Sequence, residues 1–199
     1  MSHYRRSVFS ILIYWGIASQ AVAHEQAGVE GGLASGLLHP LSGADHLIAM
    51  VAVGLWGAQL GAPAIWLLPI TFPLVMAIGG VLGVLHIPLP APELAIALSA
   101  LVLGAVVATR FRAPLAASAV LVGLFAIFHG HAHGVELPSA AHPLAYGVGF
   151  VTATGLLHLC GIVIGALSRW PLGERLIQAL GAAIAALGCY FLALSVGAA

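Results

Sequence analysis

Apolar residues fill six long stretches of this chain, and short breaks rich in Gly and Pro separate them. Each stretch is near the ~20 residues that an α-helix needs to cross a bilayer, and each is hydrophobic on all sides rather than along one stripe. The breaks have turn chemistry, as in GAP at residues 61–63. We therefore predict an all-α, polytopic membrane protein with six transmembrane helices. The predicted helices cover residues 32–60, 64–85, 92–109, 114–134, 143–168 and 172–197.

A shorter apolar stretch near the start predicts a cleavable signal peptide over residues 1–23. Arg5 and Arg6 form its basic beginning, residues 8–18 its apolar middle, and Ala-Val-Ala at 21–23 an A-x-A cleavage site. The alternative is an uncleaved first transmembrane helix, but the apolar run is short for a span. Cleavage would leave a single six-helix transmembrane domain over residues 24–199.

The arginines predict the orientation of the helices. Cleavage places the mature N-terminus, His24, in the periplasm, and the loops near residues 110 and 170 then face the cytoplasm. Positively charged residues favour cytoplasmic loops, and these two loops hold every arginine that remains after cleavage. The predicted location is thus the inner membrane, with several passes. The arginines concerned are Arg110, Arg112, Arg169 and Arg175.

Composition supports a membrane protein and excludes several functions. The chain is 61% hydrophobic and 6% charged, with a mean hydropathy of +1.10, whereas soluble domains carry roughly 25% charged residues. It contains no lysine, which excludes a Walker A ATPase and a lysine Schiff base for retinal or pyridoxal phosphate. The net charge is near zero, so we expect no nucleic-acid partner. Cys160 and Cys189 lie in apolar runs, where we expect buried thiols.

The first predicted span contains an acid between histidines, in the order His39, Asp45 and His46. A carboxylate at bilayer depth costs about 2.5–3.5 kcal/mol on insertion scales, which marks it as functional. Imidazole and carboxylate together bind divalent transition metals. On a regular helix His39, His46 and Met50 share a stripe. Pro40 lacks an N–H, and the sequence leaves open whether the helix is broken there.

Two later spans also carry histidines. His129, His133 and Glu136 have the i, i+4, i+7 spacing of one helical face, while His131 points elsewhere. His158 lies near the middle of the fifth span. A lone buried histidine is usually a hydrogen-bonded packing residue, but several occur here with two acids in a chain that has almost no other charge. We therefore predict a shared divalent-metal site or pathway and no permanently bound cofactor. The predicted ligands are His39, Asp45, His46, His129, His133, Glu136 and His158, with His24, His131 and Met50 as additional candidates.

Three motifs resemble those of the HupE/UreJ family. The stretch HPLSGADHLIAMVAVGL at residues 39–55 resembles the family signature, FHGHAHGVE at 128–136 is similar to its second motif, and TGLLH at 154–158 matches a third. The resemblance implies an inner-membrane permease for Ni²⁺ or Co²⁺ that supplies a metalloenzyme such as hydrogenase or urease. It carries metal-binding or transport roles onto His39, Asp45, His46, His129, His133 and Glu136.

Two other functions fit parts of this pattern. An intramembrane zinc hydrolase would use three histidines as ligands and Asp45 as base, but no separate nucleophile, substrate-binding signature or HExxH motif is present. A haem protein would use His39 with His129 or His158 as axial ligands. We expect a permease rather than an enzyme, with the metal ion and the lipid bilayer as partners. The sequence leaves open a homo-oligomer and the energy source.

Overall fold

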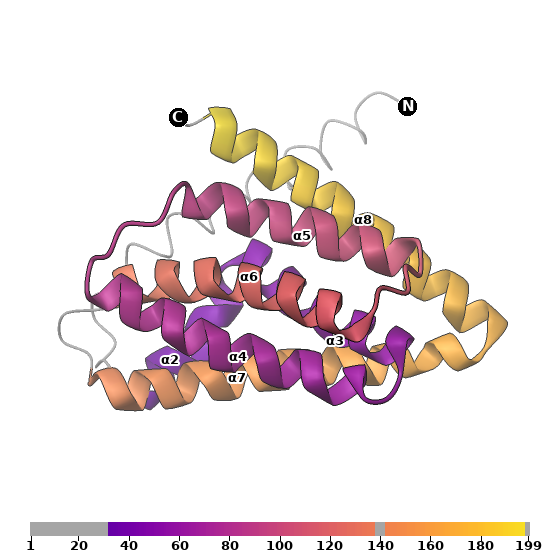
Figure 1. The fold of residues 1–199 in the computed structure, drawn as a ribbon, viewed down its shortest axis with the longest axis horizontal. Helices are drawn as coiled ribbons and strands as arrows, with labels where there is room; N and C mark the ends of the chain where they lie inside the picture. Colours follow the sequence, from indigo (N-terminus) through magenta and orange to yellow (C-terminus); the bar gives the residue numbers. More distant parts are fainter. Residues whose placement is uncertain (1–31, 138–141, 198–199) are drawn as a thin grey trace, which may run out of the picture.

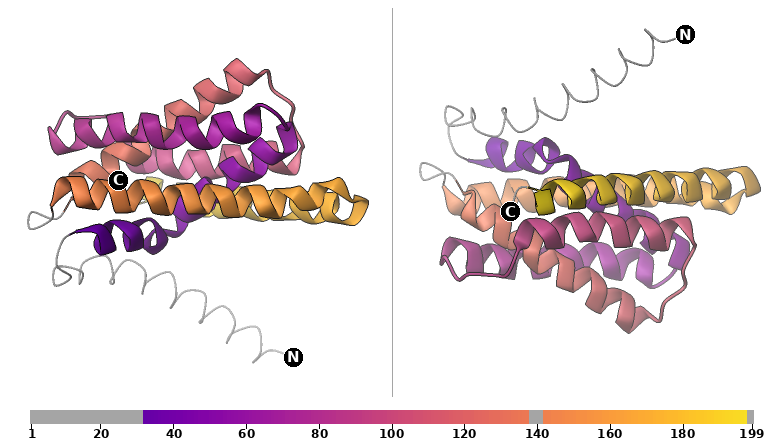
Figure 2. Two further views of the ribbon diagram at one scale, coloured as in Figure 1. Left: turned by 90° about the horizontal axis from the view of Figure 1, so that it is seen from below. Right: turned by 90° about the horizontal axis from the view of Figure 1, so that it is seen from above.

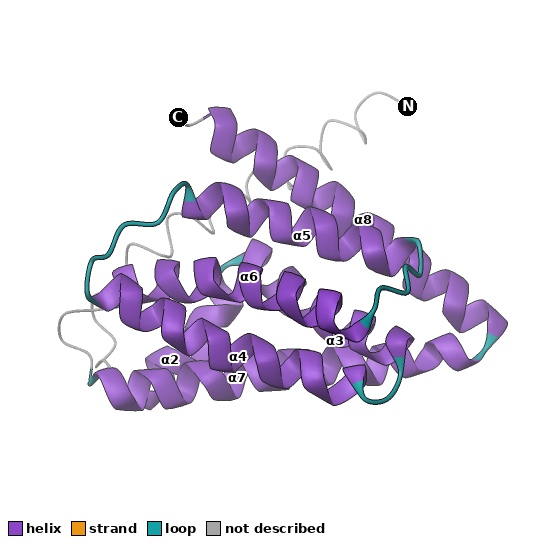
Figure 3. Cartoon of the chain, viewed as in Figure 1, coloured by secondary structure: helices purple, strands orange, loops and turns teal. Residues whose placement is uncertain are grey.

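The computed structural model describes residues 32–137 and 142–197, and the elements in that part of the chain are all helical (Figures 1 and 3). The predicted all-α class is confirmed, and each of the six apolar stretches forms helix. The predicted signal peptide and His24 lie outside the described residues. The elements are α2 (Leu33–Ser42), α3 (Ala44–Leu60), α4 (Ala64–Val84), α5 (Pro92–Ala108), α6 (Leu115–Val135), α7 (Pro143–Gly165), the 3₁₀ turn η2 (Ala166–Arg169) and α8 (Pro171–Gly197).

Four of these helices are long and apolar enough to cross a membrane by themselves. They are α4, α6, α7 continued by η2, and α8. The first apolar stretch is bent, because α2 and α3 meet at an angle of 89°, and the pair is either a broken span or a re-entrant segment. The third, α5, has 17 residues and is about 25 Å long, slightly less than the ~30 Å of a hydrocarbon core. The described residues thus form a multi-pass membrane protein with four such spans, or five when the bent pair is counted as one.

The outer surface of the helical bundle is apolar, as lipid requires. Large hydrophobic side chains stand exposed on several helices, among them Trp66, Val120 and Leu144. Cys160 and Cys189 are also exposed, so the prediction of buried thiols is wrong. The prediction fails because a helix in lipid is apolar on both its inner and its outer face. Hydrophobicity therefore does not indicate which face is buried.

Helix α3 lies in the middle of the bundle and packs against α4, α5 and α7 (Figure 2). Its closest approach is to α7, where Gly54 faces the backbone of Gly161. A Cβ added at Gly54 would meet the carbonyl oxygen of His158, and one added at Gly161 would meet that of Val51. Small residues permit this backbone contact, which is a common way for membrane helices to associate. The crossing fixes α3 against the helix that carries His158.

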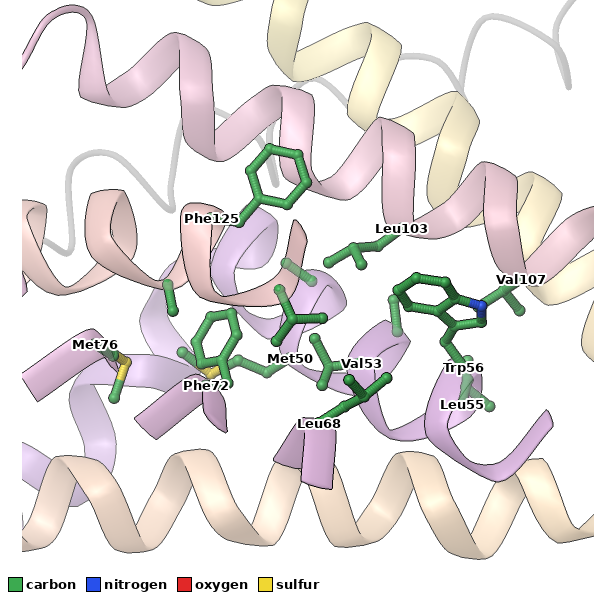
Figure 4. Packing of buried hydrophobic residues seen from close by; sticks show 14 of the residues in the cluster. Met50, Val53, Leu55, Trp56, Leu68, Phe72, Met76, Leu103, Val107 and Phe125 are labelled. Carbon is green, nitrogen blue, oxygen red and sulfur yellow. The ribbon is translucent and has the colours of Figure 1, made fainter. Parts of the chain in front are cut away.

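The apolar core follows the polar start of α3. Met50, Val53 and Trp56 are buried there and pack with Phe72 of α4 and Leu103 of α5 (Figure 4). Trp56 donates its indole N–H to the backbone oxygen of Phe111, with a nitrogen–oxygen distance of 3.0 Å. This bond ties the far end of α3 to the loop after α5. The core thereby holds the beginning of α3 at a fixed position relative to its neighbours.

The break between α2 and α3 occurs at Gly43, three residues after Pro40. Pro40 itself lies inside α2 and is buried, while Gly43 has an extended backbone with φ −96° and ψ 109°. A Cβ at Gly43 would lie 3.1 Å from Nδ1 of His46 and 3.2 Å from Oδ1 of Asp45. Both side chains fold back over the break, and glycine leaves room for them. The position of the break therefore determines where Asp45 and His46 point.

The arginines and Glu136 lie at opposite ends of the bundle, as the sequence predicts. The loops that hold the arginines lie at one end, and the end of α6 with Glu136 lies at the other (Figure 1). Arg110, just after α5, forms an ion pair with Glu174 in the first turn of α8. This pair is partly exposed, and surface ion pairs contribute about 0–1 kcal/mol to stability. We refer below to the arginine end and to the Glu136 end.

Candidate metal centre

Three candidate ligands converge at the Glu136 end, where α2 meets the last turn of α6. Nε2 of His39 lies 3.2 Å from Oε2 of Glu136, and Nδ1 of His133 lies 3.7 Å from the same oxygen. One ligand atom from each residue lies within 4.8 Å of the others. Ligands around one first-row ion are about 3 Å apart, so a small movement would bring the three onto a metal. We call this trio the outer cluster.

A second group lies directly beside the outer cluster, at the break between α2 and α3. Oδ1 of Asp45 accepts hydrogen bonds from the backbone N–H and from Nδ1–H of His46, both with a length of 2.9 Å. The His46 ring lies 4.8 Å from that of His129 and 4.4 Å from that of His133, measured between centroids. We call Asp45, His46 and His129 the middle group. Because His46 contacts both α6 histidines, the two sets of ligands are continuous.

Helix α6 explains why two of its histidines reach these sets. His129 and His133 are one turn apart on the face turned toward α2 and α3, and both are buried. Gly130 and Gly134 lie beside them on the face that packs against α4, where an added Cβ would meet the backbone of Met76 or Gly80. The close fit of α4 and α6 therefore fixes the rotation of α6. His131 points the other way, as predicted, and its Nε2 donates to the Ile87 oxygen at 2.8 Å.

Hydrogen bonds define which nitrogen is free in the His46 and His129 rings. Nδ1–H of His46 donates to Asp45, and Nδ1–H of His129 donates to the Phe125 carbonyl at 3.0 Å. A neutral imidazole with Nδ1–H carries its lone pair on Nε2. Nε2 of both residues, and both ring nitrogens of His133, are buried without a hydrogen-bond partner among the described residues. A ring fixed by a second partner with its other nitrogen free is typical of metal-ligating histidines.

Glu136 supplies negative charge at the exposed end of the outer cluster. It is the residue after α6, and its side chain is 59% exposed. The neighbouring imidazoles, that of His133 above all and then that of His39, hold the pKa of this carboxyl below its usual value. The group is therefore a carboxylate at neutral pH and can attract a cation from the surrounding solution.

The remaining candidates lie away from the outer cluster. Met50 is fully buried in the apolar core. His158 is also buried, on α7, where its ring contacts Phe72 with centroids 5.2 Å apart. Phe72 contacts His129 as well, at 5.3 Å. One aromatic ring therefore touches both the middle group and the isolated histidine of α7.

Sequence reasoning missed the aromatic side chains that surround these histidines. Phe150 lies 4.3 Å from His133 and 6.2 Å from His39, and Tyr146 lies 5.8 Å from His39, measured between ring centroids. Phe72 contacts the other side of the set. Aromatic residues are ordinary in apolar helices, so no signal in the sequence distinguishes these three from lipid-facing ones.

An apolar cavity lies next to this set, on the side of α4, α6 and α7. Its volume is about 660 Å³, and Met76, Val81, Leu144 and Phe150 are among the residues that line it. His133 and Tyr146 are the ionisable residues that line it. Its walls offer a cation almost no ligand atoms. The candidate histidines contact one another instead, through direct packing of their rings.

Comparison with known proteins identifies the family of this chain. The family model described as HupE / UreJ protein matches residues 12–191. The chain belongs to the HupE/UreJ family. The predicted resemblance is thus confirmed over nearly the whole sequence, and all of the candidate ligands lie within the matched region. Protein HupE from Rhizobium leguminosarum bv. viciae is 43% identical over 177 residues, which are 88% of this chain and 93% of that protein. No solved structure matches this HupE/UreJ protein.

Proposed function

We propose that this HupE/UreJ protein is a bacterial inner-membrane permease that imports a divalent transition-metal ion, Ni²⁺ or Co²⁺. The observation that carries the proposal is the continuous set of imidazole and carboxylate groups from Glu136 inward to His129. In the proposed orientation the Glu136 end faces the periplasm, all six apolar stretches cross the membrane, and the arginine end faces the cytoplasm. The imported metal would supply a metalloenzyme such as hydrogenase or urease.

The ligand chemistry supports a first-row ion rather than Mg²⁺ or Cu⁺. Imidazole suits Ni²⁺, Co²⁺ and Zn²⁺, whereas Mg²⁺ prefers oxygen ligands and Cu⁺ prefers sulfur. The outer cluster has two imidazoles and one carboxylate, and both cysteines of the chain are exposed elsewhere. Glu136 collects the ion, His39 and His133 replace part of its water shell, and His46 with Asp45 receives it. Binding at each step must be weak enough to permit release.

The outer cluster should set the apparent affinity for the metal. In Glu136→Gln the carboxylate becomes a neutral amide of the same shape, so the cluster loses its charge but keeps its packing. We expect the metal concentration at half-maximal uptake to rise by about tenfold or more, because charged hydrogen bonds and ion contacts of this kind are worth about 1.5–3 kcal/mol. The measurement is initial uptake of radioactive nickel or cobalt by cells that express each variant at equal level.

His133→Asn and His86→Asn form a matched pair for the same assay. His86 is exposed at the same end of the bundle, and its backbone has φ 52°, which asparagine tolerates. We expect His133→Asn to weaken uptake at low metal concentration and His86→Asn to leave it unchanged. Equal uptake by Glu136→Gln, His133→Asn and the unaltered protein at limiting metal would exclude the outer cluster as an entry point.

Competition between ions provides an independent prediction without any substitution. Unlabelled Co²⁺ and Ni²⁺ should each suppress uptake of the other, while a hundredfold excess of Mg²⁺ should have little effect, because Mg²⁺ dehydrates reluctantly and binds imidazole poorly. Dose–response curves in vesicles would measure this order. Suppression by Mg²⁺ as strong as that by Ni²⁺ would contradict a site built on imidazole.

Retention of metal by the purified protein separates this proposal from the zinc hydrolase considered above. A permease should release its metal readily on dialysis against a chelator. Stoichiometric zinc that resists such dialysis would favour the hydrolase, in which the metal stays in the protein through each turnover.

A further inference from the structure

His158 is isolated from the other candidate ligands, but it lies further along the same line through the bundle. By position along the helices, His129 is about 9 Å from the Glu136 end of α6 and His158 about 22 Å from the corresponding end of α7. Phe72 touches both rings, with centroid distances of 5.3 and 5.2 Å. His158 is therefore the next group with a free nitrogen that an ion would meet beyond the middle group.

A proline in α4 explains how His158 is oriented. In a helix the N–H of residue 73 would bond to the carbonyl of residue 69, but Pro73 has no N–H. The carbonyl of Pro69 is thereby left without its helical donor. Nδ1–H of His158 donates to this oxygen across the helix–helix contact, at 3.2 Å. Pro73 thus creates the acceptor that holds the His158 ring.

The orientation of the His158 ring leaves possible ligand atoms unpaired in the interior. A neutral His158 that donates from Nδ1 keeps its lone pair on Nε2. Nε2 of His158 and Oγ1 of Thr154 are both buried and have no hydrogen-bond partner within residues 32–137 and 142–197. The two residues are 1% and 0% exposed and lie one turn apart on the same face of α7. Buried polar atoms are nearly always paired in native proteins, so these two atoms are available to a bound ion or water.

We propose that Nε2 of His158 and Oγ1 of Thr154 form a second, inner binding site for a hydrated divalent metal ion, and that Pro73 positions His158 for it. The inference rests on the proposed function, since it makes this site the last one before release. Neither α4 nor α7 contains an acidic residue. A neutral site holds a dication more weakly than the outer cluster with Glu136 or the middle group with Asp45. The affinities therefore fall in the direction of import, which favours release at the arginine end.

The first test separates binding from translocation. The variants are His158→Leu, which removes the ligand, and Thr154→Val, which removes only the hydroxyl at nearly constant shape. We expect the maximal rate of Co²⁺ uptake into proteoliposomes to fall at least tenfold in His158→Leu and about threefold in Thr154→Val. The Co²⁺ concentration at half-maximal rate should stay within twofold, because the outer cluster is unchanged. A wild-type maximal rate in His158→Leu would overturn the proposal.

Two proline variants test the positioning role, with one serving as control for the other. Pro73→Ala restores an N–H that competes for the carbonyl of residue 69, so His158 loses its partner. Pro69→Ala restores an N–H toward residue 65 and leaves the carbonyl of residue 69 free. We expect the maximal rate to fall at least fivefold in Pro73→Ala and to remain near wild type in Pro69→Ala, with similar melting temperatures. Equal effects of the two variants would overturn the role of Pro73.

Metal stoichiometry distinguishes a failure of this inference from a failure of the proposed function. Titration of the purified protein with Co²⁺, followed by visible absorption, should give one fewer bound ion per chain in His158→Leu than in the unaltered protein. If unaltered protein binds Co²⁺ but transports none, the proposed function is wrong, and the loss of one ion in His158→Leu still supports the inner site. An unchanged stoichiometry would overturn it.

Discussion

Uptake of Ni²⁺ or Co²⁺ should fall to the background of cells without the protein when Asp45 is replaced by Asn. The substitution conserves shape but removes the one aspartate of the chain, whose Oδ1 lies 2.9 Å from Nδ1 of His46. Two unit charges 4 Å apart interact by about 4 kcal/mol at an effective dielectric constant of 20, and each 1.4 kcal/mol corresponds to a factor of ten. We therefore expect at least a hundredfold loss of uptake.

Two further variants make this result interpretable. Asp45→Glu retains the charge on a longer side chain and should recover part of the uptake, whereas a purely structural role would make it as harmful as Asn. His131→Gln changes a buried histidine that donates to the Ile87 oxygen, away from the middle group, and should transport normally. Membrane fractions must contain each variant at equal amount. Normal uptake by Asp45→Asn under those conditions would refute the mechanism.

Replacement of Gly161 by Ala should cause a large loss of stability. The added Cβ would meet the carbonyl oxygen of Val51 and lie 3.0 Å from Cα of Gly54. Overpacking usually costs about 1–3 kcal/mol, and backbone atoms at a helix crossing cannot move aside as a flexible side chain can. We expect about 3 kcal/mol, which corresponds to a fall in melting temperature of roughly 6–12 °C for a chain of this size. Thermal unfolding in detergent, followed by fluorescence, measures it.

Gly155→Ala is the matched control on the same helix. An added Cβ there would meet nothing within 4 Å, so only the helix propensity changes, in favour of alanine by up to about 1 kcal/mol. We expect an unchanged or slightly raised melting temperature. Similar destabilisation by both substitutions would show that α3 and α7 do not cross at Gly161.

Much of the fold follows from local patterns in the sequence. Six apolar stretches become helix because the backbone in lipid must satisfy its own hydrogen bonds, and the ends of those helices occur at the predicted Gly and Pro breaks. The sequence left open whether the first span is broken near Pro40, and the structure places the break at Gly43. The exposed Cys160 and Cys189 show where such reasoning fails, since an apolar stretch does not indicate which of its faces meets lipid.

The candidate ligands were also identifiable, because charge is rare in this chain and expensive in a membrane. The spacing of His129, His133 and Glu136 predicted a shared helical face, and the structure has two of them in one cluster with His39. The aromatic neighbours Phe72 and Tyr146 were not identifiable, because nothing local separates them from the many other apolar residues.

The sequence by itself determined that lipid surrounds this protein, where its helices lie, and which few groups could hold a cation. These depend on local periodicity and on the free energy of transfer, which each residue contributes almost independently. Only the tertiary structure decided which groups meet. It brings His46 into contact with the two α6 histidines and leaves His158 apart from them, in contact with Phe72. Such meetings depend on the rotation and crossing of whole helices, which are fixed by backbone contacts such as Gly54 with Gly161. A carbonyl freed by Pro73 can orient His158 only because folding brings α4 and α7 together.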